Sequence, residues 1–446
     1  MPDDFTSGGR GSQWLAGLAV VAVVGGCRSD PGSDTGAGPT IPPVDSSTAD
    51  SSTVDTRADV EGDGGDASDR VALDRLRDWF DVRCGARPVG KGEVGSIYEF
   101  AFDVTEGDHS FAVVPFTRRG RLRPLSLTNP SGRTLDVTGE YRHQNYRLFR
   151  GGDWKSPPTD VGRVGLTPFD WPIVVPYAPQ FRDAFEAGTW QLRIEANRGA
   201  PCLYVASKST TDRPEIDLNL YGVGVPTFSP SEVPDGEPVA SALATARRIL
   251  SDAGIEFGRV EGRRVPERIA DRYQIVRERR DVSRLAAWGR MPDRREAALS
   301  VDVFLVLDLM IGPGGRAAGN TPSLPGAPGL HGNLRNGVVL RASDLRARPE
   351  LVGYTLAHEL AHFLGLRHTT EIVRTSQAAR RLERTIGSTD PIRDTPECGD
   401  VLERGPENCP DRQNLMFPIA PSSPGGAAVR LTAGQSDALR SHPLVR

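Results

Sequence analysis

The chain has 446 residues, of which 38% are hydrophobic and 25% are charged, and its formal net charge at pH 7 is -4. This length predicts two or three domains rather than one small core. The charge balance supplies no basic footprint, so it excludes nucleic acid as an expected partner.

An apolar run marks the N-terminus. Residues 14–24 read WLAGLAVVAVV, which is too short to span a bilayer as a mature helix but suits the h-region of a secretory signal. The four residues from Val24 to Cys27 resemble the lipobox of bacterial lipoproteins, in which cleavage precedes a cysteine that becomes lipid-modified. The resemblance implies a signal peptide over residues 1–27, lipidation at Cys27, and export to the bacterial cell envelope or surface with the lipid as membrane anchor.

The start of this signal departs from the lipoprotein pattern, because Asp3 and Asp4 offset the charge of Arg10. A plain secretory signal, with an incidental cysteine at position 27 and a secreted product, is therefore the alternative.

Residues 28–70 are rich in Ser, Thr, Gly, Pro and Asp and hold almost no large apolar side chain. Such a segment cannot bury enough surface to offset its ordering entropy. We expect it to be a disordered acidic linker.

Short alternating segments dominate residues 71–212. Gly, Pro, Asn and Asp clusters separate the segments SIYEFAF, SFAVVPF, LRPLSLT, TWQLRIEA and CLYVAS. Repeated short strands with this turn punctuation predict an antiparallel β-sandwich. No catalytic constellation appears in this stretch, so we expect an accessory domain with a spacer or binding role.

Strand and helix patterns alternate from residue 213 to residue 446. EIDLNLYGVGV and ALSVDVFLVLDL predict strands, and PVASALATARRILSDAG predicts an amphipathic helix that ends at Gly254. A long Gly- and Pro-rich loop leads to the strand VVLR at 338–341 and to a second helix that begins near Pro349. This order predicts an α/β (or α+β) domain with a mixed, twisted sheet. We expect VVLR at the sheet edge, where an extended peptide can pair with it.

The second helix and the residues just after it carry three of the seven histidines, in YTLAHELAHFLGLRHTTE. His358 and His362 lie one turn apart on one helical face and can bind one metal ion. Gly365 is expected to end the helix in the left-handed conformation, so that His368 can turn back as a third ligand. Three neutral imidazoles around zinc leave a position for a water whose pKa falls to about 7, and Glu359 can serve that water as general base. The pattern predicts a hydrolytic zinc site.

The complete string from His358 to His368, HExxHxxGxxH, is the pattern of metzincin zinc metallopeptidases. Met416, in RQNLMFP, is the candidate for the methionine turn that such enzymes place beneath the metal. Further landmarks resemble, in order, those of the pappalysin-like branch: Asp394-Thr395-Pro396, Cys409-Pro410, Asn414-Leu415-Met416 and LTAGQSDALR. The resemblance is specific over residues 356–439. It implies a metzincin-like catalytic domain with an active-site helix and a substrate cleft between an upper and a lower subdomain.

Two features bear on how such a site would work. Phe417 and Pro418 stand where many relatives carry a tyrosine, so no phenol is available there to stabilise an oxyanion. His331 is an alternative donor, although a loop histidine is more often structural.

The stretch RCGARP at 83–88 is faintly similar to the cysteine switch of matrix metalloproteases, in which a propeptide thiolate occupies the zinc. Because Cys202 offers Cys84 a disulfide partner, the structural reading is preferred.

Five cysteines are an odd number for an exported chain. If Cys27 carries lipid, four remain, and our preferred pairing is Cys84 with Cys202 and Cys398 with Cys409. Each pair then lies inside one proposed domain, although four cysteines allow three connectivities.

Acidic residues gather ahead of Cys409, at Asp390, Asp394, Glu397 and Asp400. Hard oxygen ligands suit calcium, and pappalysin-like relatives bind it in this region. Asp390 and Asp394 are therefore candidate calcium ligands, with a solvated acidic loop as the alternative.

The function expected from these patterns is a surface-anchored, zinc-dependent endopeptidase that acts on protein or peptide substrates. Two alternatives stay open: a non-catalytic binding lipoprotein with a structural metal site, and a zinc hydrolase of a non-protein amide. Retention of Glu359 favours an enzyme, since a structural site needs ligands but no general base. The oligomeric state cannot be read from the sequence.

Overall fold

The computed structural model describes residues 80–446 apart from 94, 118–121, 137–171, 177–181, 183–184, 210–212, 290–298, 312–315, 333–335, 371–389, 391, 397, 399–400 and 422–428. The expected signal peptide, the lipidation site Cys27 and the linker over 28–70 lie outside the described residues. Among the helices of the described part, none combines the length and the apolarity that crossing a membrane would require.

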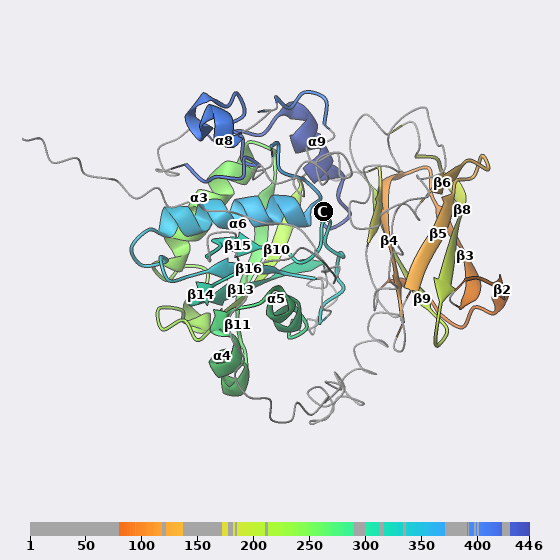
Figure 1. The fold of residues 1–446 in the computed structure, drawn as a ribbon, viewed down its shortest axis with the longest axis horizontal. Helices are drawn as coiled ribbons and strands as arrows, with labels where there is room; N and C mark the ends of the chain where they lie inside the picture. Colours follow the sequence, from red (N-terminus) through yellow and green to blue (C-terminus); the bar gives the residue numbers. More distant parts are fainter. Residues whose placement is uncertain are drawn as a thin grey trace, which may run out of the picture.

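Two antiparallel sheets form the N-terminal part of the fold (Figure 1). The first has the strand order β1 (Asp81–Arg83), β9 (Cys202–Ser209), β4 (Asp108–Phe116) and β7 (Ile173–Val175). The second has the order β2 (Pro88–Lys91), β3 (Ser96–Val104), β8 (Gly188–Ala196), β5 (Leu122–Thr128) and β6 (Thr134–Asp136).

Aromatic side chains fill the space between these two sheets. Along β3 buried and exposed residues alternate, as a strand with one face on a core requires. Phe111 of β4 contacts Phe102 of β3 and Trp190 of β8 edge to face, with ring centroids 5.2 and 4.9 Å apart, and all three side chains are fully buried. The two sheets thus pack as the sandwich that the alternating segments predict.

A five-stranded sheet forms the second part, in the order β11 (Glu256–Arg264), β10 (Glu215–Val223), β13 (Ser300–Val306), β16 (Val338–Arg341) and β15 (Gly319–Asn320). All pairs are parallel except the β15–β16 pair, so the sheet is mixed. A smaller parallel pair joins β12 (Ile275–Val276) and β14 (Asp308–Leu309). The described helices comprise α3 (Val239–Ser251), α4 (Glu267–Tyr273), α5 (Arg279–Ala286), α6 (Pro349–Phe363), α8 (Val401–Arg404) and α9 (Ala433–Ser441), with short 3-10 turns at η2 (Pro230–Glu232) and η4 (Pro406–Asn408).

The central strand β13 is buried on both faces, as a strand covered by helices on each side must be. Val301 and Val303 belong to the cluster that contains the buried faces of α3 and α6. Phe304 and Val306 belong to the cluster that contains α4 and α5. In Figure 1, α4 and α5 lie on the opposite side of the sheet from α3 and α6. The expected α/β layer with a mixed sheet is therefore present.

The expectation that VVLR forms the sheet edge is wrong. Strand β16 pairs with β13 on one side and with β15 on the other. The two-residue strand β15 comes from the Gly- and Pro-rich loop, in which the alternation that predicts a strand is missing. The outer main chain of this sheet next to α6 is therefore Gly319–Asn320.

The β-sandwich packs against the α/β layer through β4 and β9. Tyr204 of β9 is fully buried, and its hydroxyl donates a hydrogen bond of 2.5 Å to the Pro328 carbonyl. The side chains of Ser110 and Lys208 donate to carbonyl oxygens near the C-terminal end of α9. A separate apolar cluster joins the two parts, made of Val114, Tyr204, Ala206, Ala327 and Leu330. The proposed domain boundary at 212/213 falls between β9 and β10.

His442, just after α9, connects the C-terminal segment to the loop before β16. Its ring is buried, with Nε2 3.3 Å from the Gly326 carbonyl, while Nδ1 accepts a hydrogen bond of 3.2 Å from the Leu444 amide. Burial lowers the pKa of His442 to about 3, nearby Lys208 adds to this, and the bond to Gly326 opposes it. The folded protein therefore holds this imidazole neutral.

We expect His442 to make the fold acid-sensitive. The pKa of His442 is depressed in the folded state. Below pH 6.5 the unfolded chain therefore binds a proton that the folded chain does not. The free energy of unfolding decreases as the pH falls from about 6.5 towards 3. Between pH 7 and pH 5 the free energy of unfolding should decrease by about 2 kcal/mol through this group. Urea unfolding at both pH values should show a smaller loss for His442→Gln than for the unmodified chain. Equal losses would contradict the assignment.

Candidate metal centre

Helix α6 carries the first two candidate ligands, His358 and His362, and the sequence defines both of its ends. Pro349 occupies the first turn, where its missing amide costs nothing, and Glu350 adds a favourable charge there. At the other end Gly365 has φ 110°, which side-chain-bearing residues avoid. The Leu366 amide bonds to the Ala361 carbonyl and the Gly365 amide to that of His362, which is a Schellman ending.

This ending returns the chain towards the helix and brings the three histidines together. His368 Nε2 lies 3.3 Å from His358 Nε2 and 3.2 Å from His362 Nε2, and all three side chains are buried. Ligands about 2.05 Å from a tetrahedral zinc ion are separated by about 3.3 Å. The spacing therefore matches a zinc centre, and the residues form one potential metal group.

Main-chain carbonyls set which ring nitrogen carries the proton. His358 Nδ1 lies 2.7 Å from the Leu415 carbonyl, and His362 Nδ1 lies 2.7 Å from the Leu366 carbonyl. Each Nδ1 must donate to its carbonyl, so each neutral ring directs a lone pair from Nε2 towards the third histidine. Since a neutral His368 can donate to only one of them, the arrangement suits a cation between the rings.

Electrostatics favour the neutral, ligand-competent form of both helix histidines. Burial lowers the pKa of His358 to about 3, and repulsion by His368 adds to this, while the hydrogen bond to Leu415 opposes it. Burial, followed by repulsion from the other two histidines, lowers the pKa of His362 well below its ordinary value. Metal binding at this site would therefore have few protons to displace from these two rings.

Glu359 is buried beside the ligands. Burial raises the pKa of its carboxyl group to about 8, and a hydrogen bond from Thr321 opposes that rise. The Thr321 hydroxyl lies 2.7 Å from Oε2, whereas Oε1 is buried and finds no hydrogen-bond partner among the described residues. A divalent cation nearby favours the ionised form. One carboxylate oxygen is therefore held, and the other is left to accept a proton.

The edge strand β15 approaches Glu359 so closely that a side chain is excluded. A Cβ atom on Gly319 would lie 2.6 Å from Glu359 Cγ and 2.7 Å from Oε1. We expect Gly319→Ala to displace the carboxylate; for the zinc hydrolase expected from the sequence, this should lower activity by roughly tenfold to 100-fold with the zinc content unchanged. Gly90→Ala is the matched control, because a Cβ there meets nothing within 4 Å. Full activity of Gly319→Ala would show that the carboxylate tolerates this movement.

The predicted methionine turn adjoins the histidines. Met416 is fully buried, its amide donates to Asn414 Oδ1 at 2.8 Å, and its carbonyl accepts from the Thr369 amide at 3.1 Å. The preceding Leu415 carbonyl is the acceptor for His358 and also for the Tyr354 hydroxyl, 3.2 Å away. The turn therefore orients a ligand through its main chain, and Phe417 beside it is buried.

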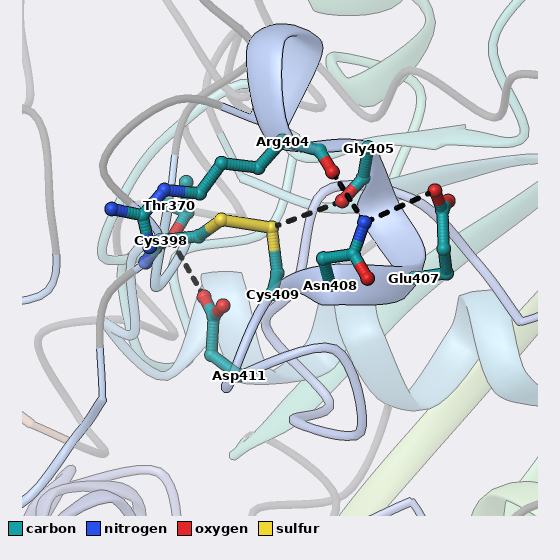
Figure 2. Close-up of a disulfide and its surroundings, with 8 residues drawn as sticks. All are labelled: Thr370, Cys398, Arg404, Gly405, Glu407, Asn408, Cys409 and Asp411. Carbon is teal, nitrogen blue, oxygen red and sulfur yellow. Dashed lines mark hydrogen bonds between the residues drawn. A yellow bond between two sulfur atoms is a disulfide. The ribbon is translucent and has the colours of Figure 1, made fainter.

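Two disulfides have the preferred connectivity, Cys84–Cys202 and Cys398–Cys409. Cys84 carries no free thiol, so the cysteine-switch hypothesis is wrong. In the second bridge, shown in Figure 2, the Cys398 amide donates to Thr370 Oγ1, which donates to Asp411 Oδ2 at 2.6 Å. Since the two sulfurs bond to each other, they are not free to bind a metal with Asp411. The bridge instead fastens the segment after His368 to the segment before the methionine turn.

The candidate calcium ligands accept hydrogen bonds from the protein. Asp390 accepts from the Ile392 amide, from Thr395 and from Gln435, and Asp394 accepts from Thr432 and the Gly434 amide. Burial raises the pKa of Asp390 to about 6, and these hydrogen bonds oppose the rise. Thr432 and Gln435 form the capping box of α9. Among the described residues neither aspartate belongs to a potential metal group, and Glu397 and Asp400 lie outside them.

His331 forms a buried pair with Asp302 of β13, Nδ1 to Oδ2 at 2.8 Å, and its Nε2 lies 3.5 Å from Ser300. Asn219 also donates to Asp302, at 3.0 Å. These contacts favour the structural reading of His331 over a role as oxyanion donor.

Sequence patterns did not reveal four groups of this site: the carbonyls of Leu366 and Leu415, the hydroxyl of Thr321 and the bare Cα of Gly319. A carbonyl carries no residue-specific signal. Thr321 and Gly319 stand in the loop GNTPS, where no periodicity marks them.

Comparisons with known proteins add little to this geometry. No protein-family model matches the chain, and no curated protein matches it. Among solved structures, metalloproteinase-II from Bacteroides fragilis is similar over 81% of this chain and 87% of its own, with 12% sequence identity and a TM-score of 0.27. A likeness at this level carries no inference about the present chain.

Proposed function

We propose that this chain is a zinc-dependent endopeptidase that hydrolyses peptide bonds with water as the nucleophile. The observation that supports it most is the meeting of three buried histidines, with His368 Nε2 at tetrahedral spacing from the Nε2 atoms of His358 and His362, beside a buried glutamate. The HExxHxxGxxH resemblance to metzincins adds to this support.

Each residue has a stated task in this proposal. His358, His362 and His368 hold the zinc, and the Leu415 and Leu366 carbonyls keep the first two rings oriented. Bound zinc supplies Lewis acidity, which activates water and polarises a carbonyl. Glu359 takes the proton of the attacking water on Oε1 and delivers it to the leaving amine. Gly319 and Thr321 set the place from which this carboxylate acts.

A binding lipoprotein with a structural metal site is the alternative from another class. Its weakness is Glu359, since a structural ion needs ligands but no general base, and a buried carboxyl with an unpartnered oxygen then adds only a desolvation penalty. A zinc hydrolase of a non-protein amide is the second alternative, because the metal and the base do not select the acyl group.

The test is to assay zinc and digestion together on the purified protein. We expect about one zinc per chain and cleavage of a denatured protein and of a peptide library, both lost after treatment with a zinc chelator. Bound zinc without cleavage of either substrate would favour the binding lipoprotein. Cleavage of cell-wall amides alone would favour the second alternative.

We further propose that the protein is exported and held at the bacterial cell surface by lipid on Cys27. Two disulfides support an oxidising compartment. In Cys27→Ser, membrane association of the exported protein should be lost. An unchanged distribution would favour the plain secretory signal.

A further inference from the structure

We propose that Thr321 is a positioning residue for Glu359, and that the β-sandwich keeps Thr321 in place by clamping the loop that carries it. This inference rests on the proposed function, because the positioned group is the proposed general base. We call residues 321–330 the base loop. It follows edge strand β15 and lies between helix α6 and the β-sandwich.

Thr321 contacts Glu359 twice. Its Oγ1 lies 2.7 Å from Glu359 Oε2 and 3.0 Å from the Glu359 carbonyl oxygen, and both residues are buried. The hydroxyl is thereby located by the helix main chain as well as by the carboxylate. The hydrogen bond from Thr321 engages one lone pair of Oε2, whereas Oε1 has no hydrogen-bond partner among the described residues, so Thr321 favours Oε1 as the oxygen that takes the proton.

The base loop is packed on the side of α6 through Gly326. The Gly326 amide donates to the Phe363 carbonyl at 2.7 Å, and a Cβ atom on Gly326 would lie 2.2 Å from the Phe363 ring. His442 bonds to the Gly326 carbonyl. The loop is thus fastened to the last turn of the helix that carries Glu359 and His362.

The β-sandwich closes the other side of the base loop. Tyr204 donates to the Pro328 carbonyl at 2.5 Å, and Ala327 and Leu330 pack in one apolar cluster with strands β4 and β9. Beyond the base loop, Asn336 accepts a hydrogen bond of 3.2 Å from the Ala327 amide. Every residue of the base loop except Leu324 is buried. The accessory sheet therefore acts as the outer wall of the segment that orients the base.

The kinetic test compares two valine variants of the full-length zinc-loaded protein. We expect Thr321→Val to lower kcat by about tenfold to 100-fold with KM and zinc content close to those of the unmodified enzyme. Thr321→Ser, which keeps the hydroxyl, should restore most of kcat. Thr355→Val is the matched control, since that buried hydroxyl bonds to the Leu351 carbonyl of its own helix. Unchanged kcat in Thr321→Val, or equal losses in the two valine variants, would overturn the proposal.

A second comparison addresses the clamp. Tyr204→Phe removes only the hydroxyl that holds Pro328, and Ser110→Ala removes an interdomain hydrogen bond that does not reach the base loop. We expect Tyr204→Phe to lower kcat more than Ser110→Ala does, with KM unchanged in both. Equal kcat values would show that the β-sandwich does not act on the base.

A double-mutant cycle on thermal stability separates this inference from the proposed function. Thr321→Val, Glu359→Ala and the double variant should give Tm shifts that are not additive, because the first two remove the same contact. Additive shifts would overturn the positioning role whether or not the enzyme is active. If the unmodified protein cleaves no peptide while the shifts are non-additive, the proposed function fails and the Thr321–Glu359 coupling stands.

Discussion

Glu359→Gln should abolish measurable hydrolysis while leaving the zinc in place. Glutamine has the shape of glutamate and still offers Thr321 an acceptor oxygen, but it cannot take a proton from water. Loss of a general base lowers rates by about 10² to 10⁴. The three histidines keep their spacing and their carbonyl partners, so the zinc content should remain at about one per chain. The measurements are kcat/KM on a cleaved peptide and metal analysis of the same sample.

Glu350→Gln is the matched control for this result, because it makes the same change in the first turn of the same helix at an exposed position. It should leave both kcat/KM and zinc content unchanged. If Glu359→Gln kept the activity of the unmodified enzyme, water activation by this carboxylate would be wrong. If it lost zinc as well, the loss of activity would report on metal binding instead.

Removing each of the two disulfides in turn should affect stability and zinc affinity differently. The Cys84–Cys202 bridge closes a separation of 118 residues and Cys398–Cys409 one of 11. By chain entropy, removing the first by a double serine substitution costs about 5 kcal/mol, and removing the second costs about 3 kcal/mol. Denaturant unfolding of the two variants should show this order.

The loss of zinc affinity should follow the reverse order, with the larger loss on removal of Cys398–Cys409. Cys398–Cys409 holds Thr370 and Asp411, on either side of the segments that carry His368 and the Leu415 carbonyl. Loss of such outer support weakens metal binding by about tenfold to 100-fold. Cys84–Cys202 joins strands of the β-sandwich, so its removal should leave zinc affinity intact at a temperature where the variant is folded. Equal zinc affinities in the two variants would contradict the supporting role of the second bridge.

Most of the correct predictions rest on local sequence patterns. The spacing of His358 and His362 follows from the helical period, and Gly365 adopts the left-handed conformation that was expected of it. Those two facts suffice to bring His368 back, because a Schellman ending reverses the chain within a few residues. The strands of the β-sandwich were readable from a local pattern too, since buried and exposed residues alternate strictly in β3 from Tyr98 to Val104.

The rest depends on contacts between segments far apart in the chain. Strand β15 has two residues, too few for any period, and its place outside β16 is decided by tertiary pairing. Thr321 is 38 positions from Glu359, and the Leu415 carbonyl is 57 from His358. Strand β11, of charged and small residues, was missed because its apolar side chains are few. The hydrogen bonds of Asp394, a candidate calcium ligand, to the start of α9 were likewise not readable from the sequence.

The continuous buried contact between the β-sandwich and the α/β layer has a consequence for heating and for limited proteolysis. One cluster of buried apolar side chains includes members of both parts, from Phe102 to Leu360. Unfolding of either part would expose buried apolar surface of the other. Calorimetry should therefore record one endotherm. A protease cut between β9 and β10 would yield two fragments that co-elute until denaturant is added.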